Sequence, residues 1–442
     1  MKLYFFCARD VRDYLQNFPE AKTLNFPPDE FNPSAFMRIA RIQNFLYTDI
    51  MSSVACRDEA LNAPICGETG IDGLRLDFNF GLRLDVPEGN FRVRIGEIGG
   101  RIFFDEKVSD MRLISVEKYF IRWHVEVFSD DVKIFEHVFF DLTGQPVLVA
   151  AQTQALGDTL ALLPAVDELR RRFDCKVSLH LPEFLREFAA HLYPEINVVD
   201  ATDYEHYATF YPNLIRGNSP INPTDARDGN LAKVLGEILG IDWFASKATF
   251  TPTAPPVTSE PYVCIAVQAS ANRKCWLWPN GWDIVVDYLK TLGYRVFCID
   301  KNSSATNDGV TIEMPAGAED FTGNFPIMER ANMLYHAEFF IGLGSGLSWV
   351  ADAVNCPVVM ICGFSKDWCE FYSPYRVINR LICNGCLNDV RDEDFLTGVC
   401  PRHKGTPRAF ECQRKISPQQ VLNAVERLIV DRNLTPPALK KF

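Results

Sequence analysis

Long apolar runs and clustered positive charge are both missing from this chain of 442 residues. No apolar run approaches the roughly 20 residues that a membrane-spanning helix needs, which argues against a transmembrane segment. No stretch is dense in Lys or Arg, and the net charge is −12. Because a negatively charged surface repels phosphate backbones, we expect neither a membrane nor a nucleic acid as partner.

The N-terminus also lacks the marks of a signal peptide. The segment MKLYFFCARDVRDYL (1–15) has only a short apolar run before Arg9 and Asp10, with no small-residue cleavage site. We therefore expect a cytoplasmic protein. Hydrophobic residues make up 47% of the chain and charged residues 23%, as is ordinary for a globular protein. A chain of this length exceeds a single compact core, so we expect two or three domains.

The first third of the chain changes its hydrophobic period once. Residues 1–70 are irregular apart from a helix expected over 35–54. From about 71 to 145, apolar and polar residues alternate between turn signals, which is typical of antiparallel strands with one solvated face. We read these strands as a small β-barrel or β-sandwich, and predict a β-barrel-like N-terminal domain over residues 1–145.

At Pro146 the pattern changes to alternating strands and helices. PVLVAAQ (146–152) is apolar throughout, as in a strand buried on both faces, and a helix with apolar residues at helical spacing follows. This alternation predicts a parallel sheet of the Rossmann type over 146–255. A Pro/Thr-rich linker at 251–261 leads to a second such half over 256–380. The predicted class is therefore α/β, with a cleft between two Rossmann-like halves.

Two shorter segments complete the predicted organisation. Residues 381–415 are rich in Cys, Gly and Pro, and residues 416–442 contain a closing helix with Ser417 as its N-cap.

The first candidate for chemistry is the turn LGDTLALLP, where Gly157 and Asp158 lie between a buried strand and a helix. Asp is a favoured N-cap and Gly suits a tight turn, so a capping role is one interpretation. Ligands also gather at the carboxyl ends of such strands, so a catalytic base is the other. The residues alone leave the two about even.

A glycine-rich turn in the second half is the next candidate. In FFIGLGSGLSWVADA, Gly342, Gly344 and Gly346 surround Ser345 at the start of a predicted helix. Backbone N–H groups at a helix N-terminus bind phosphate oxygens, and glycine lets a diphosphate approach. Close packing of strand on helix explains the glycines nearly as well.

The third candidate, QASANRKCWLWPNGW, follows the first strand of the second half. Arg273 and Lys274 could neutralise a diphosphate leaving group there. Trp276, Trp278 and Trp282 could stack on a base or sugar, although we expect at least one of them to lie in the core.

Four cysteines gather near the C-terminus, and we expect Cys383, Cys386, Cys400 and Cys412 to bind one metal ion. A reducing compartment disfavours disulfides, and the spacing permits a four-thiolate site. Zinc and iron both suit tetrahedral sulfur ligation, with zinc the commoner ion in such closed sites. Four thiolates leave no open position, so the role is structural. We expect His403 in an exposed turn rather than as a ligand.

Together these motifs resemble the ADP-heptose glycosyltransferases of the GT-B fold. The shared features are the GD turn at Gly157, the basic segment at Arg273 and the stretch GSGLSWVADAV…PVVMICG. Gly344 stands where that family usually has Asp, and Trp349 where it usually has His. These departures, the β-rich N-terminus and the late cysteine quartet are similar to one branch, the bacterial autotransporter heptosyltransferases.

The resemblance implies a donor, an acceptor and a metal. It implies inverting transfer of heptose from ADP-heptose to serines of an autotransporter adhesin, by a homo-oligomer that is a dodecamer in that family. It also implies iron in the four-cysteine site, with zinc as the alternative. A lipopolysaccharide-core heptosyltransferase and a non-enzymatic sugar-nucleotide-binding scaffold remain the other hypotheses.

Inverting transfer requires a base for the acceptor hydroxyl and positive charge for the departing diphosphate. We assign Asp158 as the base and Lys274 as the cation. Backbone amides of the glycine turn would hold the phosphates, so no catalytic divalent metal is expected. The full set of predicted substrate-binding residues is Gly157, Thr159, Gln268, Ser270, Arg273, Trp276, Trp282, Gly344, Ser345, Gly346, Leu347 and Ser348.

Overall fold

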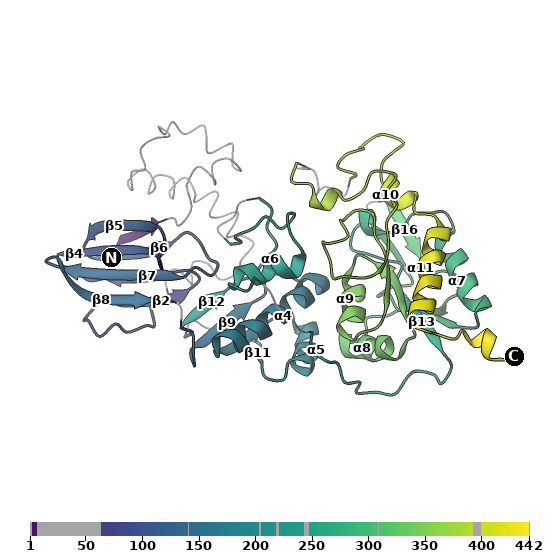
Figure 1. The fold of residues 1–442 in the computed structure, drawn as a ribbon, viewed down its shortest axis with the longest axis horizontal. Coiled ribbons are helices and arrows are strands. Elements are labelled where there is room, and N and C mark those ends of the chain that lie inside the picture. Colours follow the sequence, from purple (N-terminus) through teal and green to yellow (C-terminus); the bar gives the residue numbers. More distant parts are fainter. Residues whose placement is uncertain are drawn as a thin grey trace.

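The structure is a computed structural model, and it describes residues 2–6, 63–139, 141–202, 205–217, 221–242, 247–307, 309–391 and 399–441. The helix predicted over 35–54 lies outside these ranges. Figure 1 shows an antiparallel sheet at one end of the molecule, the first Rossmann-like half in the middle, and the second half with the C-terminus at the other end.

The antiparallel sheet has the strand order β5-β4-β7-β8. Its strands are β4 (Phe91–Glu97), β5 (Ile102–Val108), β7 (Trp123–Ser129) and β8 (Val132–Val138). Alternate residues of the inner strands, such as Val93 and Ile95 on β4 and Val125 and Val127 on β7, are fully buried. This is the one-sided burial that the period of two predicts.

A second sheet runs from the β-rich region into the first Rossmann-like half, in the order β1-β6-β3-β2-β12-β9-β10-β11. Its strands are β1 (Lys2–Phe6), β2 (Arg75–Asn79), β3 (Arg83–Val86), β6 (Met111–Ser115), β9 (Pro146–Ala150), β10 (Lys176–His180), β11 (Asn197–Val199) and β12 (Ala208–Phe210).

Parallel pairing of β2 with β12, Ala208 opposite Phe78, joins the two regions. The predicted strands are therefore shared between two sheets instead of closing one barrel, because the edge of the parallel sheet accepts β2. The division of the chain near residue 145 stays a prediction.

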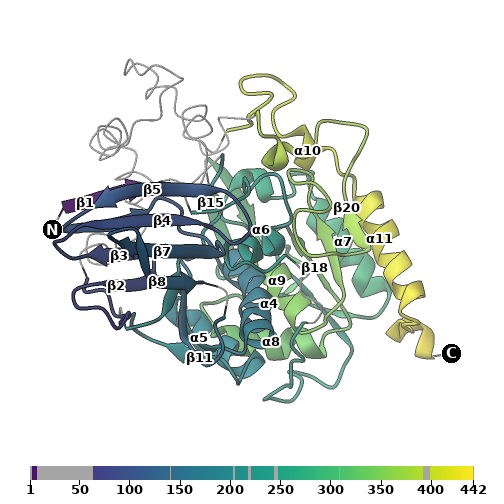
Figure 2. The same cartoon turned by 60° about the vertical axis from the view of Figure 1, so that its left-hand side comes forward.

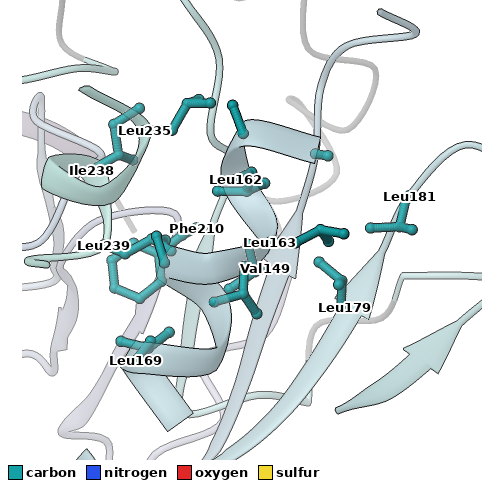
Figure 3. Packing of buried hydrophobic residues seen from close by; sticks show 14 of the residues in the cluster. Val149, Leu162, Leu163, Leu169, Leu179, Leu181, Phe210, Leu235, Ile238 and Leu239 are labelled. Carbon is teal, nitrogen blue, oxygen red and sulfur yellow. The ribbon is translucent and has the colours of Figure 1, made fainter. Parts of the chain in front are cut away.

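Helices cover the parallel strands of the first half: α4 (Leu156–Phe173), α5 (Glu183–Leu192) and α6 (Leu231–Ile238). Figure 3 shows Leu162, Leu163 and Leu169 of α4 packed among Val149 of β9 and residues of α6. Burial of each such leucine contributes about 1.5–3 kcal/mol, so this layer fixes where α4 begins relative to the strand ends.

The second half is a parallel sheet in the order β17-β14-β13-β18-β19-β20. Its strands are β13 (Tyr262–Ile265), β14 (Arg295–Cys298), β17 (Glu319–Asp320), β18 (Phe340–Leu343), β19 (Val358–Ile361) and β20 (Tyr375–Val377). A hairpin of β15 (Ser304–Asn307) and β16 (Val310–Glu313) follows β14. The helices are α7 (Gly281–Thr291), α8 (Ile327–His336) and α9 (Gly346–Ala353).

The linker at 251–261 is irregular, as predicted, and α8 holds it. The Asn332 side chain accepts hydrogen bonds from the backbone amides of Thr253 (2.8 Å) and Ala254 (3.2 Å). A buried amide group therefore holds the linker against the second half.

The C-terminal region begins with short turns and ends with helices. It contains η3 (Cys386–Asn388), α10 (Glu411–Arg414), α11 (Pro418–Asp431) and η5 (Pro437–Lys441). Ser417 caps α11 in a capping box with Gln420, which confirms the predicted cap. Within the described ranges, no helix combines the length and apolar character needed to cross a membrane.

Candidate active site between the two halves

Asp158 lies in the first turn of α4, and Ala155 is the N-cap of that helix. The capping interpretation of Asp158 is therefore wrong, because α4 begins at Leu156, one residue before Gly157, and Asp158 is its third residue. The Asp158 side chain is half-buried. Burial raises the pKa of Asp158, and the nearby Lys274 ammonium partly offsets that rise. A carboxylate with a raised pKa is suited to accept a proton near neutral pH.

The turn before α4 meets the glycine turn before α9. A Cβ on Gly346 would lie 2.8 Å from Cβ of Leu156, and one on Gly157 would lie 2.8 Å from Cδ1 of Trp349. Figure 2 shows α4 and α9 next to each other, and the two helices are in contact. Glycine is needed at both positions because the two halves touch there.

Lys274 comes to the same place from the second half. It ends the short turn η2 (Asn272–Lys274), which follows β13. Its ammonium nitrogen lies 5.8 Å from the centre of the Phe364 ring, a cation–π contact. Burial raises the pKa of Asp158 and the Lys274 ammonium lowers it, so the two side chains lie within electrostatic range although they come from opposite halves.

Further positive charge lies near Arg273, the chain neighbour of Lys274. Burial, together with the guanidinium groups of Arg227 and Arg273, lowers the pKa of Arg216 to about 10. Arg216 and Arg227 belong to a loop of the first half, whereas Arg273 belongs to the second. Arg227 is paired with Asp225, with Nη2 and Oδ2 2.7 Å apart, so Arg216 and Arg273 carry the charge that favours an anionic ligand between the halves. Sequence analysis missed Arg216, since a lone Arg in a loop carries no signal.

Several predicted substrate-binding side chains lie in the core instead. Thr159 and Ser348 are fully buried, and their hydroxyls donate to the backbone oxygens of Ala155 (3.0 Å) and Leu343. Both hydroxyls stabilise the turns before α4 and α9, and their predicted role in binding a ligand is corrected.

Two predicted tryptophans are also core residues. Trp276 and Trp282 pack edge-to-face with ring centres 5.3 Å apart, and both are buried. Trp276 donates its indole N–H to Ile416 O at 2.8 Å. The prediction that either stacks on a base or sugar is corrected, and Trp278 packs against the same core.

The remaining predicted residues lie along the two turns. Gln268 donates its side-chain amide to Asn302 O at 2.9 Å, which ties the β15–β16 hairpin to this loop. Ser270 is exposed. Ser345 is the N-cap of α9, and its amide already donates to Leu343 O at 2.7 Å.

The amides of Gly346 and Leu347 follow in the first turn of α9, where helical N–H groups have no partner within the helix. These two amides, rather than that of Ser345, are left to bind an anion.

Two buried carboxylates support the site, and sequence analysis missed both. Asp300, at the end of β14, accepts hydrogen bonds from the amides of Val267 (2.7 Å) and Gln268 (3.2 Å). Burial raises the pKa of Asp300 to about 6, although those amides oppose the rise. Asp300 thus fixes the first residues of the loop that ends at Lys274.

Glu370 lies behind the glycine turn. It forms a buried ion pair with Arg376, with Nη2 and Oε2 2.7 Å apart. A Cβ on Gly344 would lie 3.0 Å from Glu370 Oε1 and 2.8 Å from Cys362 Sγ. The buried carboxylate fills the space that a side chain at 344 would need, which gives a physical reason for glycine there.

The four predicted metal ligands lie in one region near the C-terminus. Cys386, Cys400 and Cys412 are each 7% exposed, and Cys383 is half-buried. Burial raises the pKa of the Cys412 thiol, and the sulfurs of Cys386, Cys400 and Cys383 raise it further. The charge effects show that the other three sulfurs lie in the surroundings of Cys412, and a soft sulfur donor set suits iron or zinc.

Side chains around Cys383 fit a supporting role. Arg402 Nη1 lies 3.7 Å from Cys383 Sγ, and the Cys383 amide donates to Glu411 at 3.2 Å. Sulfur of Cys383, nitrogen of His403 and oxygen of Glu411 lie within 4.8 Å of one another. Glu411 is engaged by Arg408, which argues against its use as a ligand. His403 is half-buried beside Glu411, not exposed as expected.

Family models match both regions of the chain. Residues 70–131 match the glycosyltransferase TibC N-terminal domain, and residues 229–398 match glycosyltransferase family 9 (heptosyltransferase). The autotransporter heptosyltransferase BAHTCr of Citrobacter rodentium is 40% identical over 81% of this chain and 90% of its own length. This chain belongs to the autotransporter heptosyltransferases. It is a glycosyltransferase with the GT-B fold, as the motifs predicted.

A second relative has a solved structure. The autotransporter heptosyltransferase TibC of Escherichia coli O78:H11 is 38% identical over 83% of this chain and 92% of its own length. The crystal structure of iron-containing dodecameric TibC aligns with a TM-score of 0.78 and 37% identity, over 84% of this chain and 99% of that chain. TibC has also been solved in complex with ADP-D-β-D-heptose.

A third relative lacks activity. BimC of Burkholderia thailandensis, described as an inactive autotransporter heptosyltransferase, is 32% identical over 81% of this chain and 87% of its own length. The role of each site residue therefore has to be tested on this chain itself.

Proposed function

We propose that this protein transfers heptose from ADP-heptose to serine hydroxyls of an autotransporter adhesin, with inversion at the anomeric carbon. One observation carries the proposal: Asp158 and Lys274 come from opposite halves and lie close enough for one charge to act on the other. The complex of TibC with ADP-D-β-D-heptose supports the choice of donor.

Asp158 is the base in this scheme. The acceptor oxygen attacks the anomeric carbon from the face opposite to ADP, and its proton passes to the Asp158 carboxylate. Burial, which raises the pKa of Asp158, makes the carboxylate a stronger proton acceptor. Such base catalysis contributes a factor of about 10² to 10⁴.

Positive charge and backbone amides take up the departing diphosphate. Lys274 neutralises it directly, and Arg273 adds a second cation from the same turn. The amides of Gly346 and Leu347, at the positive end of the α9 dipole, bind the phosphates in this scheme. These fixed groups replace the divalent metal that other glycosyltransferases use, because the charge that develops in the transition state is already matched.

We further propose that the four cysteines hold one structural iron ion, with zinc as the alternative. Four thiolates close the coordination sphere, so when bound the metal supplies a crosslink between the segments that carry the cysteines. The iron-containing, dodecameric state of TibC supports both iron and a dodecamer here. Location in the cytoplasm, where thiols stay reduced, is consistent with this site.

The decisive experiment measures sugar transfer by intact mass. The protein is incubated with ADP-heptose and the adhesin passenger domain, and the passenger is expected to gain whole heptose units on serines. A matched reaction with a lipopolysaccharide-core acceptor tests the other glycosyltransferase hypothesis. If neither acceptor gains mass and the donor is not hydrolysed, the protein is a binding scaffold and the proposal fails.

A further inference from the structure

Gln413 is fully buried, although it is a polar residue directly after one of the clustered cysteines. Its side-chain amide donates to Arg273 O at 2.6 Å. Its own backbone oxygen accepts the amide of Leu277 at 3.2 Å. We call residues 271–277, which include η2, the donor-site turn. Gln413 therefore forms hydrogen bonds to this turn on both sides of Lys274, at Arg273 and at Leu277.

The same cysteine-rich segment also holds Phe364, the residue whose ring contacts the Lys274 ammonium. Phe364, whose ring lies under the Lys274 ammonium, accepts the amide of Leu387 at 2.9 Å through its backbone oxygen. The preceding oxygen, of Gly363, accepts the amide of Gly385 at 2.9 Å. These two donors flank Cys386, just as Gln413 adjoins Cys412.

The donor-site turn has little structure of its own. Within η2 the amide of Lys274 donates to Ala271 O at 3.0 Å, and the turn ends after three residues. So short a turn has too few internal bonds to fix a long, flexible lysine side chain. The position of Lys274 must therefore come from its neighbours. On one side these are bonded to Gln413, next to Cys412, and on the other to the two residues that flank Cys386.

We propose that Gln413 is a positioning residue that couples the cysteine-rich segment 383–412 to Lys274. It fixes the backbone of Arg273, and through it the place of the ammonium relative to the departing diphosphate. This inference rests on the proposed role of Lys274. Because catalysis by a fixed charge depends on its placement, displacement of the turn slows the chemical step more than it weakens substrate binding.

The test uses Gln413→Met, which keeps the length of the side chain and removes its hydrogen-bonding groups. We expect kcat to fall by about 10- to 100-fold, with KM for ADP-heptose changed less than threefold, on the scale seen when a catalytic group is displaced by about 1 Å. Gln419→Met, at an exposed position of α11, is the matched control and should leave both constants unchanged.

Two further variants separate positioning from stability. Trp276→Phe removes the neighbouring bond to Ile416 and opens a cavity, so it should lower the melting temperature with little change in kcat. Gln413→Met is also combined with Lys274→Met. If Gln413 acts through Lys274, the double variant is no slower than Lys274→Met alone.

Three outcomes overturn the proposal. The first is an unchanged kcat in Gln413→Met. The second is a double variant whose loss of rate is the product of the losses in Gln413→Met and Lys274→Met. The third is an equal loss of kcat in Gln413→Met and Trp276→Phe when the two variants have the same melting temperature. All rates are normalised to folded protein, counted by bound metal per chain. Full activity of Lys274→Met by itself would instead refute the proposed function, so the two failures are distinguishable.

Discussion

The two sides of the site are held in place by different means. On the Asp158 side, apolar packing fixes the turn: α4 leucines lie on the parallel sheet, and Gly157 touches Trp349. On the Lys274 side, hydrogen bonds from distant segments fix it, through Asp300 on one flank and Gln413 on the other. The first side needs a well-packed core, whereas the second needs the cysteine-rich segment to be folded.

This difference predicts which perturbations are selective. Loss of metal should disturb Lys274 and spare Asp158, and overpacking near Gly157 should do the reverse. A substitution that displaces Asp158 and Lys274 equally would show that the two sides of the site are held in place together.

The largest effect is expected from removal of a metal ligand. Cys400→Ser should abolish bound iron, which in the intact protein should be about one per chain, because a single four-ligand site binds one ion. Metal binding is coupled to local folding, so the second half should melt earlier or the protein should become insoluble. Elemental analysis and calorimetry measure this. Full metal loss with unchanged melting and activity would contradict a structural role.

Next in size is removal of the Lys274 charge. Lys274→Met should slow transfer by about 10² to 10³, or roughly 3–4 kcal/mol, as when one preorganised electrostatic partner is lost. The half-buried side chain contributes little to the core, so the melting temperature should stay near that of the wild type. Lys404→Met, at an exposed position, is the control. Steady-state rates with ADP-heptose decide the matter, and wild-type turnover would remove Lys274 from the site.

A smaller effect is expected from Gly157→Ala. The added methyl would meet Trp349 at 2.8 Å, and overpacking of this kind costs about 1–3 kcal/mol of unfolding free energy. A second substitution, Trp349→Leu, should recover part of that loss because it clears the space. Denaturant unfolding of the single and double variants tests the contact. Purely additive losses would mean that the two residues do not meet.

The smallest effect concerns pH. Because burial raises the pKa of Asp158 in the folded protein, its protonated form is favoured on folding. The Asp158 contribution to stability is therefore present at low pH and is lost as pH rises through the folded-state pKa. Activity should change in the opposite sense, since the base must be ionised. As pH rises through the folded-state pKa of Asp158, the melting temperature of the wild type should fall while its kcat/KM rises. Asp158→Asn should not show these opposite changes.

The alternation of strands and helices could be predicted because each element carries its own period. β9, α4 and the turn at Gly157 follow directly from PVLVAAQ and the spaced leucines after it. The sharing of β-rich strands between two sheets could not, because Phe78 pairs with Ala208, 130 positions along the chain. Pairing across that distance leaves no trace in local pattern.

The site divides in the same way. Asp158, Lys274 and the glycine turn follow local rules for strand ends and helix starts. Burial of Trp276 and Trp282 was missed because an aromatic cluster in a turn looks the same whether it faces a ligand or the core. Asp300 and Gln413 were missed because their hydrogen bonds join segments far apart in the sequence.

The central claim is that Asp158 is the base, and Asp158→Asn tests it most directly. Asn has nearly the same shape but cannot accept the proton, and it removes a half-buried charge. We predict a folded protein that melts no earlier than the wild type, still binds ADP, and transfers heptose more slowly by about 10² to 10⁴. Intact-mass time courses with the adhesin passenger measure the rate. Transfer at the wild-type rate by Asp158→Asn would contradict the account.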